Sequence, residues 1–521
     1  MKLSRRKFVG ALGAGFAASA IPFDVWLKKQ ARASGIMTRY STSSVEGKKM
    51  LKIYAKAVQL MQGKWAGDPH SWTFQWFTHW TPGDSASYKS KREVIEKLYG
   101  PGPSPDKSLA QDMWNTCQGH GGANNPENQE QYFLVWHRMY VFYLEQIVRN
   151  VTGFPTFTLP YWPYDEPDKR SIPIEFRSPA NNSNPLYRQD RNTKPSKPQN
   201  NINNGGSMDL YGALNFRCME QKSFFPVSGS AQEGFNAMLN GNPHGQVHDD
   251  VGTATNMGFV PTAAGDPVFW MHHSQVDRLW ESWNAAGGKN PTDQAFLNKT
   301  FVFDDGNGNR VVAKNGDFLD IEKLGYRYDT LMNIPRVGAP ELLSSSDASK
   351  MVMMAGTKMD EMPMGNHEKM LKGAAAQDVI HLRKTPVKIE LKNTNKTTTP
   401  APMLLKSAPA NQKIFLIVSG IFASTPPGTS FSVYLNLPED VKPTTSSPYY
   451  VGVINFFNAT SMPGMGDMQM TDDFVFDVTE TIKFLNNEGT PLSDISVTVE
   501  PNSDLNAGSK PYIGSIEIVI E

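Results

Sequence analysis

Ten histidines occur in the chain, and eight of them lie before residue 330. His244 and His248 stand four positions apart, so on a helix both imidazoles project from one face and can reach the same metal ion. Polar pairs at this spacing are also common on helix surfaces, so the pair alone is a weak sign of a metal site. The interpretation depends on whether other segments present histidines toward the same place.

A second segment supplies two more histidines. Asp266 can cap a helix, and Pro267 suits its first turn. The apolar stripe of this predicted helix includes His273, whereas His272 lies about 100° round the helix axis. A buried imidazole without a partner costs about 1–3 kcal/mol, so His273 needs either a metal ion or a backbone carbonyl beside it.

A third segment repeats the arrangement. Phe133, Tyr140 and Leu144 form one apolar stripe of a predicted helix, and His137 takes a place within that stripe. Helical bundles build metal sites in this way, from side chains that project inward from facing helices. The pattern therefore predicts a mainly α domain with a histidine-rich metal centre in its core.

The sequences around these histidines resemble two known motifs. Residues 136–140 read Trp-His-Arg-Met-Tyr, and residues 266–280 begin Asp-Pro-Val-Phe and contain two adjacent histidines. Both segments are similar to the copper signatures of tyrosinases and catechol oxidases, which are type-3 copper proteins. The resemblance runs from about Leu51 to Asp329, and residues 326–328, Tyr-Arg-Tyr, resemble the tyrosine pair that ends the catalytic domain of the family.

The resemblance implies two copper ions, each bound by three histidines. It assigns His79, His120 and His137 to the first ion, and His244, His248 and His273 to the second. One spacing departs from the family pattern, because His120 and His137 stand seventeen positions apart where nine is usual. Either a loop insertion at 121–130 separates them, or Asn128 occupies the ligand position.

The ligand type also favours copper over other metals. Imidazole binds copper in both oxidation states, whereas thiolates favour Cu(I) and carboxylates suit harder ions. A hydrolytic zinc ion would call for a general-base carboxylate, and none accompanies either histidine set. Asp266, Asp277 and Arg138 are interpreted as groups that orient the ligands or pack the helices.

Cys117 and Cys218 are the only cysteines, so no disulfide framework holds the chain together. Many relatives carry a thioether between a cysteine and the second ligand of the first copper. Cys117 stands three positions before His120, one more than is common for that thioether. A thioether, a plain thiol and a bridge to Cys218 all stay open.

The overall charge balance limits which partners the protein is expected to bind, and the N-terminal sequence indicates the compartment in which it works. Lysine plus arginine balance aspartate plus glutamate at 51 each, so no net field favours nucleic acid or an acidic membrane. Residues 1–33 combine Arg5-Arg6, an apolar run too short to span a membrane, and an Ala-Arg-Ala end. They resemble a twin-arginine export signal, which predicts cleavage near Ala33 and a periplasmic or secreted protein without membrane contact.

The family resemblance implies an oxidase that uses O₂ to convert o-diphenols, small phenolic substrates, into o-quinones. Tyrosinases that also hydroxylate monophenols often pair an asparagine after the first ligand of the second copper with a nearby glutamate. This chain has Gly245 and Asn240 there, which favours diphenol oxidation, with tyrosinase or o-aminophenol oxidase activity as alternatives. A haemocyanin-like oxygen carrier would use the same copper pair, but the export signal and single copper domain favour an enzyme.

After the export signal, the resemblance implies a four-helix-bundle dicopper domain (34–335). Composition then indicates a linker rich in methionine, serine and lysine (336–385) and a β-rich domain (386–521). Short alternating runs between turn residues predict seven strands in the last part, and hence a β-sandwich. The runs are Val387–Leu391, Lys413–Val418, Phe431–Leu437, Tyr450–Phe456, Phe474–Val478, Ile495–Val499 and Ser515–Ile520.

Long relatives carry a similar C-terminal domain, which covers the copper entrance with one side chain and keeps the enzyme latent until it is cleaved off. Phe456 or Phe457 is the candidate for that side chain. The segment 461–470 also offers four thioethers, which are soft ligands for Cu(I). Met462, Met465, Met468 and Met470 either capture copper for delivery or fill an irregular segment.

Overall fold

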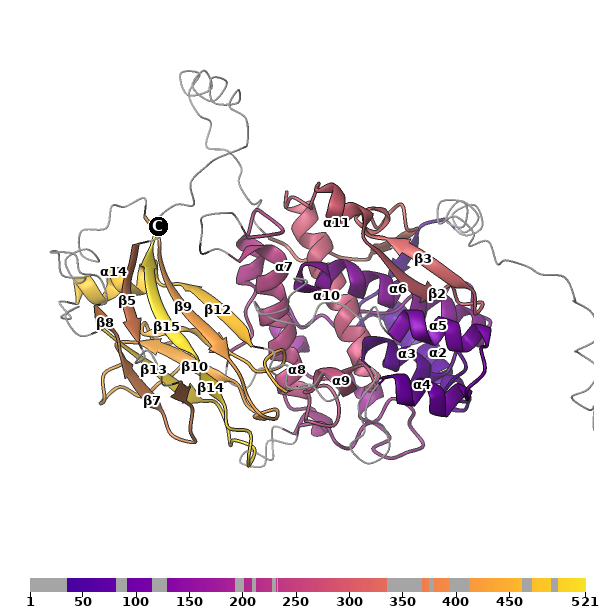
Figure 1. Cartoon of the computed structure of the whole chain (residues 1–521), viewed down its shortest axis with the longest axis horizontal. Helices are drawn as coiled ribbons and strands as arrows, with labels where there is room; N and C mark the ends of the chain where they lie inside the picture. Colours follow the sequence, from indigo (N-terminus) through magenta and orange to yellow (C-terminus); the bar gives the residue numbers. More distant parts are fainter. Residues whose placement is uncertain are drawn as a thin grey trace, which may run out of the picture.

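The computed structural model describes residues 35–80, 91–114, 129–192, 201–208, 212–226, 231, 233–334, 368–373, 379–393, 412–461, 471–488 and 495–521, with the backbone alone at 129–130, 368–373 and 392–393. Within these ranges a helical unit is followed by a β-sandwich (Figure 1), which confirms the predicted fold class. No helix among these residues is both long and apolar enough to cross a membrane.

Two long helices form the centre of the helical unit. All of α6 (Phe133–Thr152) from Phe133 to Val148 is buried, and α10 (Val268–Ala285) packs against it. The apolar stripes of these two helices are the ones predicted around His137 and His273. The other helices of the unit are α2 (Val45–Gln62), α3 (Trp72–His79), α4 (Lys91–Tyr99), α5 (Pro105–Trp114), α7 (Gly234–Leu239), α8 (Gln246–Val251), α9 (Val260–Ala263) and α11 (Gln294–Asn298).

Side-chain caps fix where the helices that carry histidines begin. Ser71 precedes α3, and its hydroxyl accepts a hydrogen bond from the backbone N–H of Phe74 at 3.0 Å. Asp266 precedes α10 and accepts from the N–H of Val268 at 3.0 Å, as its place before Pro267 predicted. Both caps satisfy N–H groups that the first helical turn leaves without an internal partner.

A buried charge network joins the ends of the helical unit. Strand β1 (Met37–Arg39) pairs in parallel with β4 (Tyr326–Tyr328). Asp277 accepts hydrogen bonds from Arg39 at 2.9 Å, from Tyr326 at 2.8 Å, from Tyr328 at 2.5 Å and from Arg138 of α6. Asp277 and Arg138 therefore tie α10 to α6 and contact the tyrosine pair, which agrees with their interpretation as packing groups.

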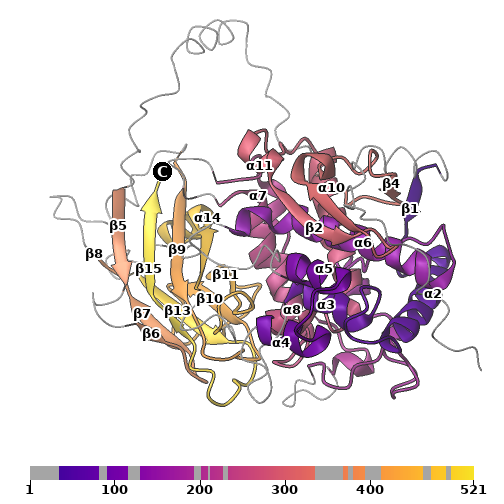
Figure 2. The same cartoon turned by 45° about the vertical axis from the view of Figure 1, so that its right-hand side comes forward.

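Two antiparallel sheets form the sandwich, with the strand orders β11-β10-β13-β7 and β12-β9-β15-β5-β8 (Figure 2). Side chains from both sheets share one apolar core. All seven predicted runs are strands. The strands are β5 (Glu368–Gly373), β6 (Ile380–His381), β7 (Val387–Glu390), β8 (Lys392–Asn393), β9 (Ile414–Ile421), β10 (Phe431–Leu435), β11 (Tyr450–Ile454), β12 (Asp472–Asp477), β13 (Ser496–Pro501), β14 (Tyr512–Ile513) and β15 (Ser515–Ile520).

Part of the segment expected as a linker belongs to the sheets. β5 pairs with β15, and β6 pairs with β14. The sequence of β5, Glu-Lys-Met-Leu-Lys-Gly, lacks the apolar alternation of a half-buried strand, so its pairing follows from the exposed backbone of β15 and not from its own pattern. Residues 335–367 and the four methionines between 462 and 470 lie outside the described residues.

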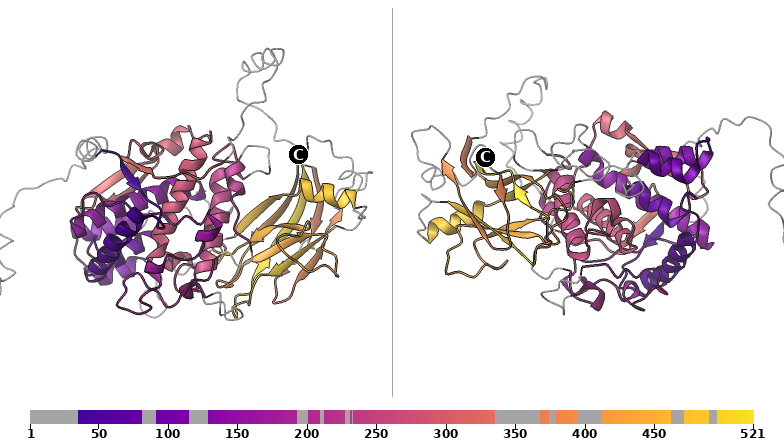
Figure 3. Two further views of the ribbon diagram at one scale, coloured as in Figure 1. Left: turned by 180° about the vertical axis from the view of Figure 1, so that it is seen from behind. Right: turned by 60° about the horizontal axis from the view of Figure 1, so that its bottom comes forward.

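The sandwich packs on the side of the helical unit that carries α7 and α8, and the views in Figures 1 and 3 agree on this placement. Polar contacts fix the junction: Asn455 Nδ2 donates to the carbonyl of Gly241 at 2.8 Å, and Arg217 Nη1 donates to the carbonyl of Val451 at 3.3 Å. A loop that follows β11 thus reaches the segment between α7 and α8.

Candidate metal centre

Five of the six predicted ligands meet in the core of the helical unit. His79 ends α3, His137 lies near the start of α6, and His273 lies in α10. His244 lies in the π-helical turn η7 (Asn240–Gly245), and His248 lies in α8. At most 1% of each residue is exposed. The sixth, His120, lies outside the described residues together with Cys117 and Asn128, so the insertion stays a prediction.

The ring distances connect the five imidazoles in one group. The centroids of His79 and His137 lie 5.5 Å apart, and His137 stacks on His273 at 4.2 Å with an interplanar angle of 10°. His273 lies 5.1 Å from His244, which lies 4.6 Å from His248. His273, a member of the second predicted set, therefore lies directly against His137 of the first set.

One further histidine, His272, lies beside the second predicted ligand set. Possible ligand atoms of His244, His248, His272 and His273 all lie within 4.8 Å of one another. The group consists of four imidazoles. It is a set of nitrogen donors suited to copper.

Backbone carbonyls fix the tautomers of four of these imidazoles. A carbonyl can only accept, so the Nδ1 that faces it must carry the proton, and in the neutral ring the lone pair then belongs to Nε2. The four Nδ1–H groups donate to Val260 O from His79 (3.1 Å), to Phe133 O from His137 (2.8 Å), to Asn240 O from His244 (3.1 Å) and to Met257 O from His248 (2.7 Å).

His273 provides the test of whether the residues fit a metal. Both of its ring nitrogens are buried, and neither has a hydrogen-bond partner within the described ranges. Burial lowers the pKa of His273 well below its usual value, and the neighbouring His137 lowers it further, so the ring is neutral at pH 7. A neutral buried imidazole with unsatisfied nitrogens fits a metal ligand.

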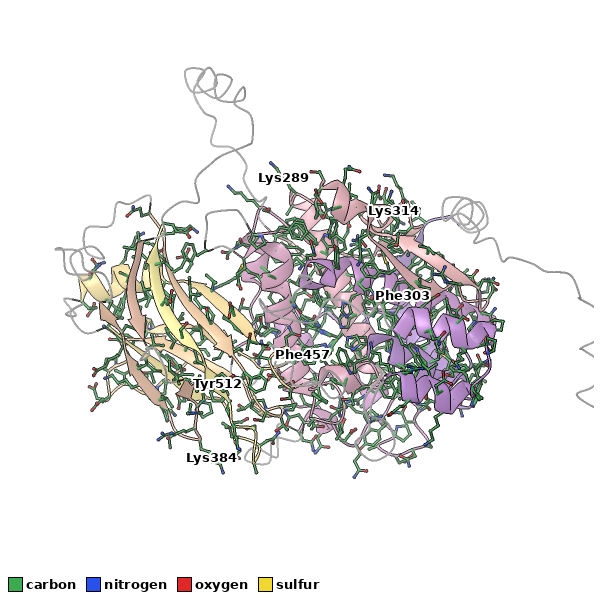
Figure 4. All side chains as sticks on the ribbon, in the orientation of Figure 1. Lys289, Phe303, Lys314, Lys384, Phe457 and Tyr512 are labelled. Carbon is green, nitrogen blue, oxygen red and sulfur yellow. The ribbon has the colours of Figure 1, made fainter. Side chains whose placement is uncertain are left out.

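Aromatic rings enclose the imidazoles. Phe133 lies 4.5 Å from His244, and Phe269 lies 4.2 Å from His273, measured between ring centroids. The third ring comes from the sandwich: Phe457 stacks on His248 at 3.8 Å with an interplanar angle of 5°. Figure 4 shows Phe457 at the boundary between the two units. Its neighbour Phe456 packs into the core of the sandwich.

Comparison with known proteins identifies the family. The profile of the common central domain of tyrosinase matches residues 69–286, and that of the polyphenol oxidase middle domain matches 290–340. A tyrosinase from Hahella sp. (strain CCB-MM4), HcTyr1, is 30% identical over 440 residues, which span 76% of this chain and 88% of the relative. The chain belongs to the tyrosinase and polyphenol oxidase family. It is therefore an enzyme, a type-3 copper oxidase with two copper ions.

Other members of the tyrosinase and polyphenol oxidase family match the long form of the chain. Polyphenol oxidase A1 of Vicia faba is 28% identical over 499 residues, which span 90% of this chain and 75% of the relative. The solved structure of latent apple tyrosinase has the same fold, with a TM-score of 0.58 at 21% identity over 94% of this chain and 97% of that one. A domain family of unknown function matches residues 369–521.

The sequence did not indicate one polar partner of the centre. The hydroxyl of Tyr164 lies 3.0 Å from Nδ1 of His272. Tyr164 lies in the irregular segment that follows α6. In such a segment neither helical nor strand periodicity indicates which positions are buried. The contact between Tyr164 and His272 exists only because the tertiary fold brings this segment beside α10.

Proposed function

We propose that this oxidase converts o-diphenols into o-quinones at copper ions bound by the six predicted histidines. His79, His120 and His137 bind the first ion, and His244, His248 and His273 bind the second. The observation that carries the proposal is the convergence of buried imidazoles whose Nδ1–H groups are held by backbone carbonyls. In the second set, possible ligand atoms of His244, His248 and His273 lie within 4.8 Å of one another, close enough to share one ion.

Copper, when bound, would carry electrons from the diphenol to O₂. The protein residues hold the imidazoles at fixed angles, because each Nδ1–H bond to a carbonyl restrains rotation of the ring. Phe133 and Phe269 line the imidazoles with apolar surface, which keeps water away from a reactive centre. The fixed rings reduce the reorganisation that a change of metal oxidation state would otherwise require.

The position of Phe457 supports an aromatic substrate. Its ring lies parallel to the imidazole of His248 at 3.8 Å, an arrangement that a flat phenolic ring can reproduce by stacking. In our proposal the phenol binds over His248 after Phe457 has left. The C-terminal domain therefore keeps the full-length chain latent, and Phe457, not Phe456, is the blocking side chain.

We further propose that diphenols are preferred to monophenols, with o-aminophenols as related substrates. Neither Gly245 nor Asn240 offers a carboxylate that would help a water molecule to deprotonate a phenol. Asn240 Oδ1 accepts a hydrogen bond from Asn458 Nδ2 of the sandwich at 3.2 Å. Both positions thus serve the contact with the C-terminal domain, and monophenol hydroxylation is the alternative.

The export prediction also belongs to the proposal. Residues 1–33 are expected to direct the folded chain through the twin-arginine route to the periplasm or the medium. The test is a fusion of residues 1–40 to a reporter that is active only after folded export. Replacement of Arg5 and Arg6 by lysine should abolish export, and export that continues unchanged would contradict the proposed route.

The function is tested by copper content and by rates on catechol and phenol. We expect two copper ions per chain, oxidation of catechol faster than of phenol, and a catechol rate in Phe457→Ala about tenfold above the full-length protein, since a latent enzyme reacts only through its open fraction. Phe154→Ala is the control, because Phe154 is 43% exposed and follows the C-terminal end of α6, whereas His137 lies near the start of that helix. Equal rates on both substrates would support tyrosinase activity instead.

A further inference from the structure

A cleft of about 760 Å³, here called the interdomain cleft, lies between the helical unit and the sandwich. One wall comes from η6 (Arg217–Glu220), α7 and η7, and the other from β9, β12 and α14 (Thr479–Asn487). Figure 1 shows β12 on the side of the sandwich that faces α7. Sites for small ligands often have this size and often lie between domains.

The interdomain cleft is separate from the copper centre. None of the proposed ligands among the described residues lines it, and neither does Phe457. Gly241 and Asn242 do line it, and they belong to η7, the turn that carries His244. A ligand in the cleft would therefore contact this turn without entering the copper centre.

The free edge of a sheet forms part of the wall. β12 is the last strand of its sheet, and all six of its residues line the cleft. The N–H of Val478 donates to the carbonyl of Ile414 at 2.8 Å, and alternate residues of an antiparallel pair bond to the partner strand. The backbone groups of Phe474 and Phe476 therefore face β9, whereas those of Val475 point away from it.

Carboxylates dominate the charge of the interdomain cleft. Six carboxylates line it, against three basic side chains. Lys413 pairs with Asp477 at 2.9 Å, Lys483 pairs with Glu480 at 2.7 Å, and Arg217 donates to a backbone carbonyl of β11 at 3.3 Å. The side chains that line the cleft thus carry an excess of negative charge.

Asp473 is the carboxylate best placed to receive a cation. Its Oδ1 accepts a hydrogen bond from the N–H of Gly420 at 2.7 Å, and no cation among the described residues pairs with it. Burial raises the pKa of Asp473 above its usual value, and the hydrogen bond from Gly420 offsets this only in part. A positive group beside Oδ2 would complete the surroundings of this carboxylate.

Apolar surface lies next to Asp473. The ring centroids of Phe474 and Phe476 lie 6.3 Å apart with an interplanar angle of 14°, and both residues line the cleft. A Cβ atom at Gly241 would lie 3.3 Å from the ring of Phe474, so this ring reaches the helical unit. Met238 adds a flexible thioether side chain to the opposite wall.

We propose that the interdomain cleft binds a small protonated aromatic amine. The ammonium group donates to Oδ2 of Asp473 and to the outward carbonyl of Val475, and the ring covers the apolar surface of Phe474 and Met238. Charge complementarity selects the cation over neutral aromatic molecules of the same shape.

Such a ligand has a consequence for latency, and this consequence rests on the proposed function. The ligand contacts both units, so it binds the docked arrangement more tightly than one in which the sandwich has left. A ligand shifts an equilibrium toward the state that it binds better. The amine therefore keeps Phe457 over His248 and holds the enzyme latent.

Binding is measured by titration calorimetry on the metal-free full-length protein, with 2-phenylethylamine as the probe. This amine has no phenol group, and without metal it cannot bind to copper. Neutral 2-phenylethanol is the control ligand. The variants are Asp473→Asn and Glu220→Gln, one from each wall, and Asp504→Asn, an exposed carboxylate outside the cleft, is the matched control. Circular dichroism checks that each variant folds.

We expect the wild type and Asp504→Asn to bind the amine at concentrations up to about 10 mM, the range of very small ligands, and to bind the alcohol about tenfold more weakly. Asp473→Asn should weaken amine binding about tenfold, since it keeps the shape but removes the charge. Glu220→Gln should weaken it at most about fivefold, because its side chain is exposed. Absence of binding, or equal binding in Asp473→Asn and Asp504→Asn, would overturn the inference.

Oxygen uptake with catechol separates this inference from the proposed function. A saturating amine should slow the copper-loaded full-length enzyme about fivefold and leave the enzyme cut between 336 and 367 unaffected. Equal slowing of both forms would contradict a ligand that bridges the two units. If the two forms oxidise catechol equally well without amine, the proposed latency is wrong, whereas calorimetry of the metal-free protein still decides whether the cleft binds the amine.

Discussion

Asp277 shows how a single buried carboxylate holds several elements together. It receives hydrogen bonds from Arg39, Arg138, Tyr326 and Tyr328. Asp277→Asn keeps the volume but removes the charge that balances two buried guanidinium groups. We expect a loss of about 3–5 kcal/mol in the free energy of unfolding, the usual cost of removing one partner of a buried ion pair.

Urea denaturation of the metal-free protein measures this loss. Asp112→Asn is the matched control, because Asp112 pairs with Arg310 on the surface and its side chain is 42% exposed. Exposed pairs contribute at most about 1 kcal/mol. If Asp277→Asn were no more destabilising than Asp112→Asn, the network would contribute little to the stability of the helical unit.

The same carboxylate predicts a pH dependence. Burial acts to raise the pKa of Asp277, but Arg138 and Arg39 outweigh it, so the pKa lies below the usual value. A lowered folded-state pKa gives stability that is present above the unfolded pKa, about 3.9, and is lost as the pH falls toward the folded value. The wild type should lose stability below about pH 4 more steeply than Asp277→Asn, as measured by thermal unfolding from pH 7 to 3.

Some of these residues were predictable from sequence and others were not. His137 and His273 interrupt apolar stripes, and their burial follows from helical periodicity alone. Phe456 and Phe457 could not be separated, because adjacent residues point to opposite sides and the sequence does not say which side faces the other unit. Tyr164 carried no signal, since its contact with His272 joins two segments that only the tertiary fold brings together.

At the scale of elements, the loop after β11 and the turn η7 fit closely. A Cβ atom at Gly245 would lie 2.6 Å from Oδ1 of Asn455, which cannot move freely because Asn455 Nδ2 donates to Gly241. Gly245→Ala should therefore push the loop that carries Phe457 away from His248. Overpacking costs about 1–3 kcal/mol, and 1.4 kcal/mol is a factor of ten in an equilibrium.

We expect Gly245→Ala to raise the catechol rate of the full-length protein about tenfold, measured at a catechol concentration well below KM. Gly102→Ala is the control, because a Cβ there would meet no atom within 4 Å. After proteolysis between 336 and 367, Gly245→Ala and the wild type should reach the same rate. A full-length Gly245→Ala enzyme as slow as the wild type would show that this contact does not hold the blocking loop.

The strands show where prediction from sequence ends at this scale. Seven apolar runs with period two were sufficient to predict seven strands of the sandwich. β5 was placed in a linker because the segment 336–385 is rich in methionine, serine and lysine, although β5 lies between β15 and β8 in the sheet. A strand whose place depends on the backbone edge of its neighbours carries no pattern of its own.

At the scale of the whole molecule, the chain has two separate apolar cores, one in the helical unit and one in the sandwich. Phe457 belongs to the core of the helical unit although it comes from the sandwich. Copper removal should act on the helical unit alone, since the five proposed ligands that the structure describes lie there. The two units should therefore respond differently when the metal is removed.

Calorimetry of the copper-loaded and metal-free proteins tests this expectation. A ligand at a concentration of 1,000 times Kd adds about 4 kcal/mol of stability, and each kcal/mol shifts Tm by about 2–4 °C in a unit of this size. Copper removal should thus lower the Tm of the helical unit by about 10 °C and leave that of the sandwich within about 2 °C. His248→Ala should show a much smaller shift, because it lacks a ligand of the second ion. An equal shift of both transitions would mean that the contacts of Phe457 and Asn455 make the two units unfold together, and the sandwich could then leave the copper entrance only through cleavage or local opening.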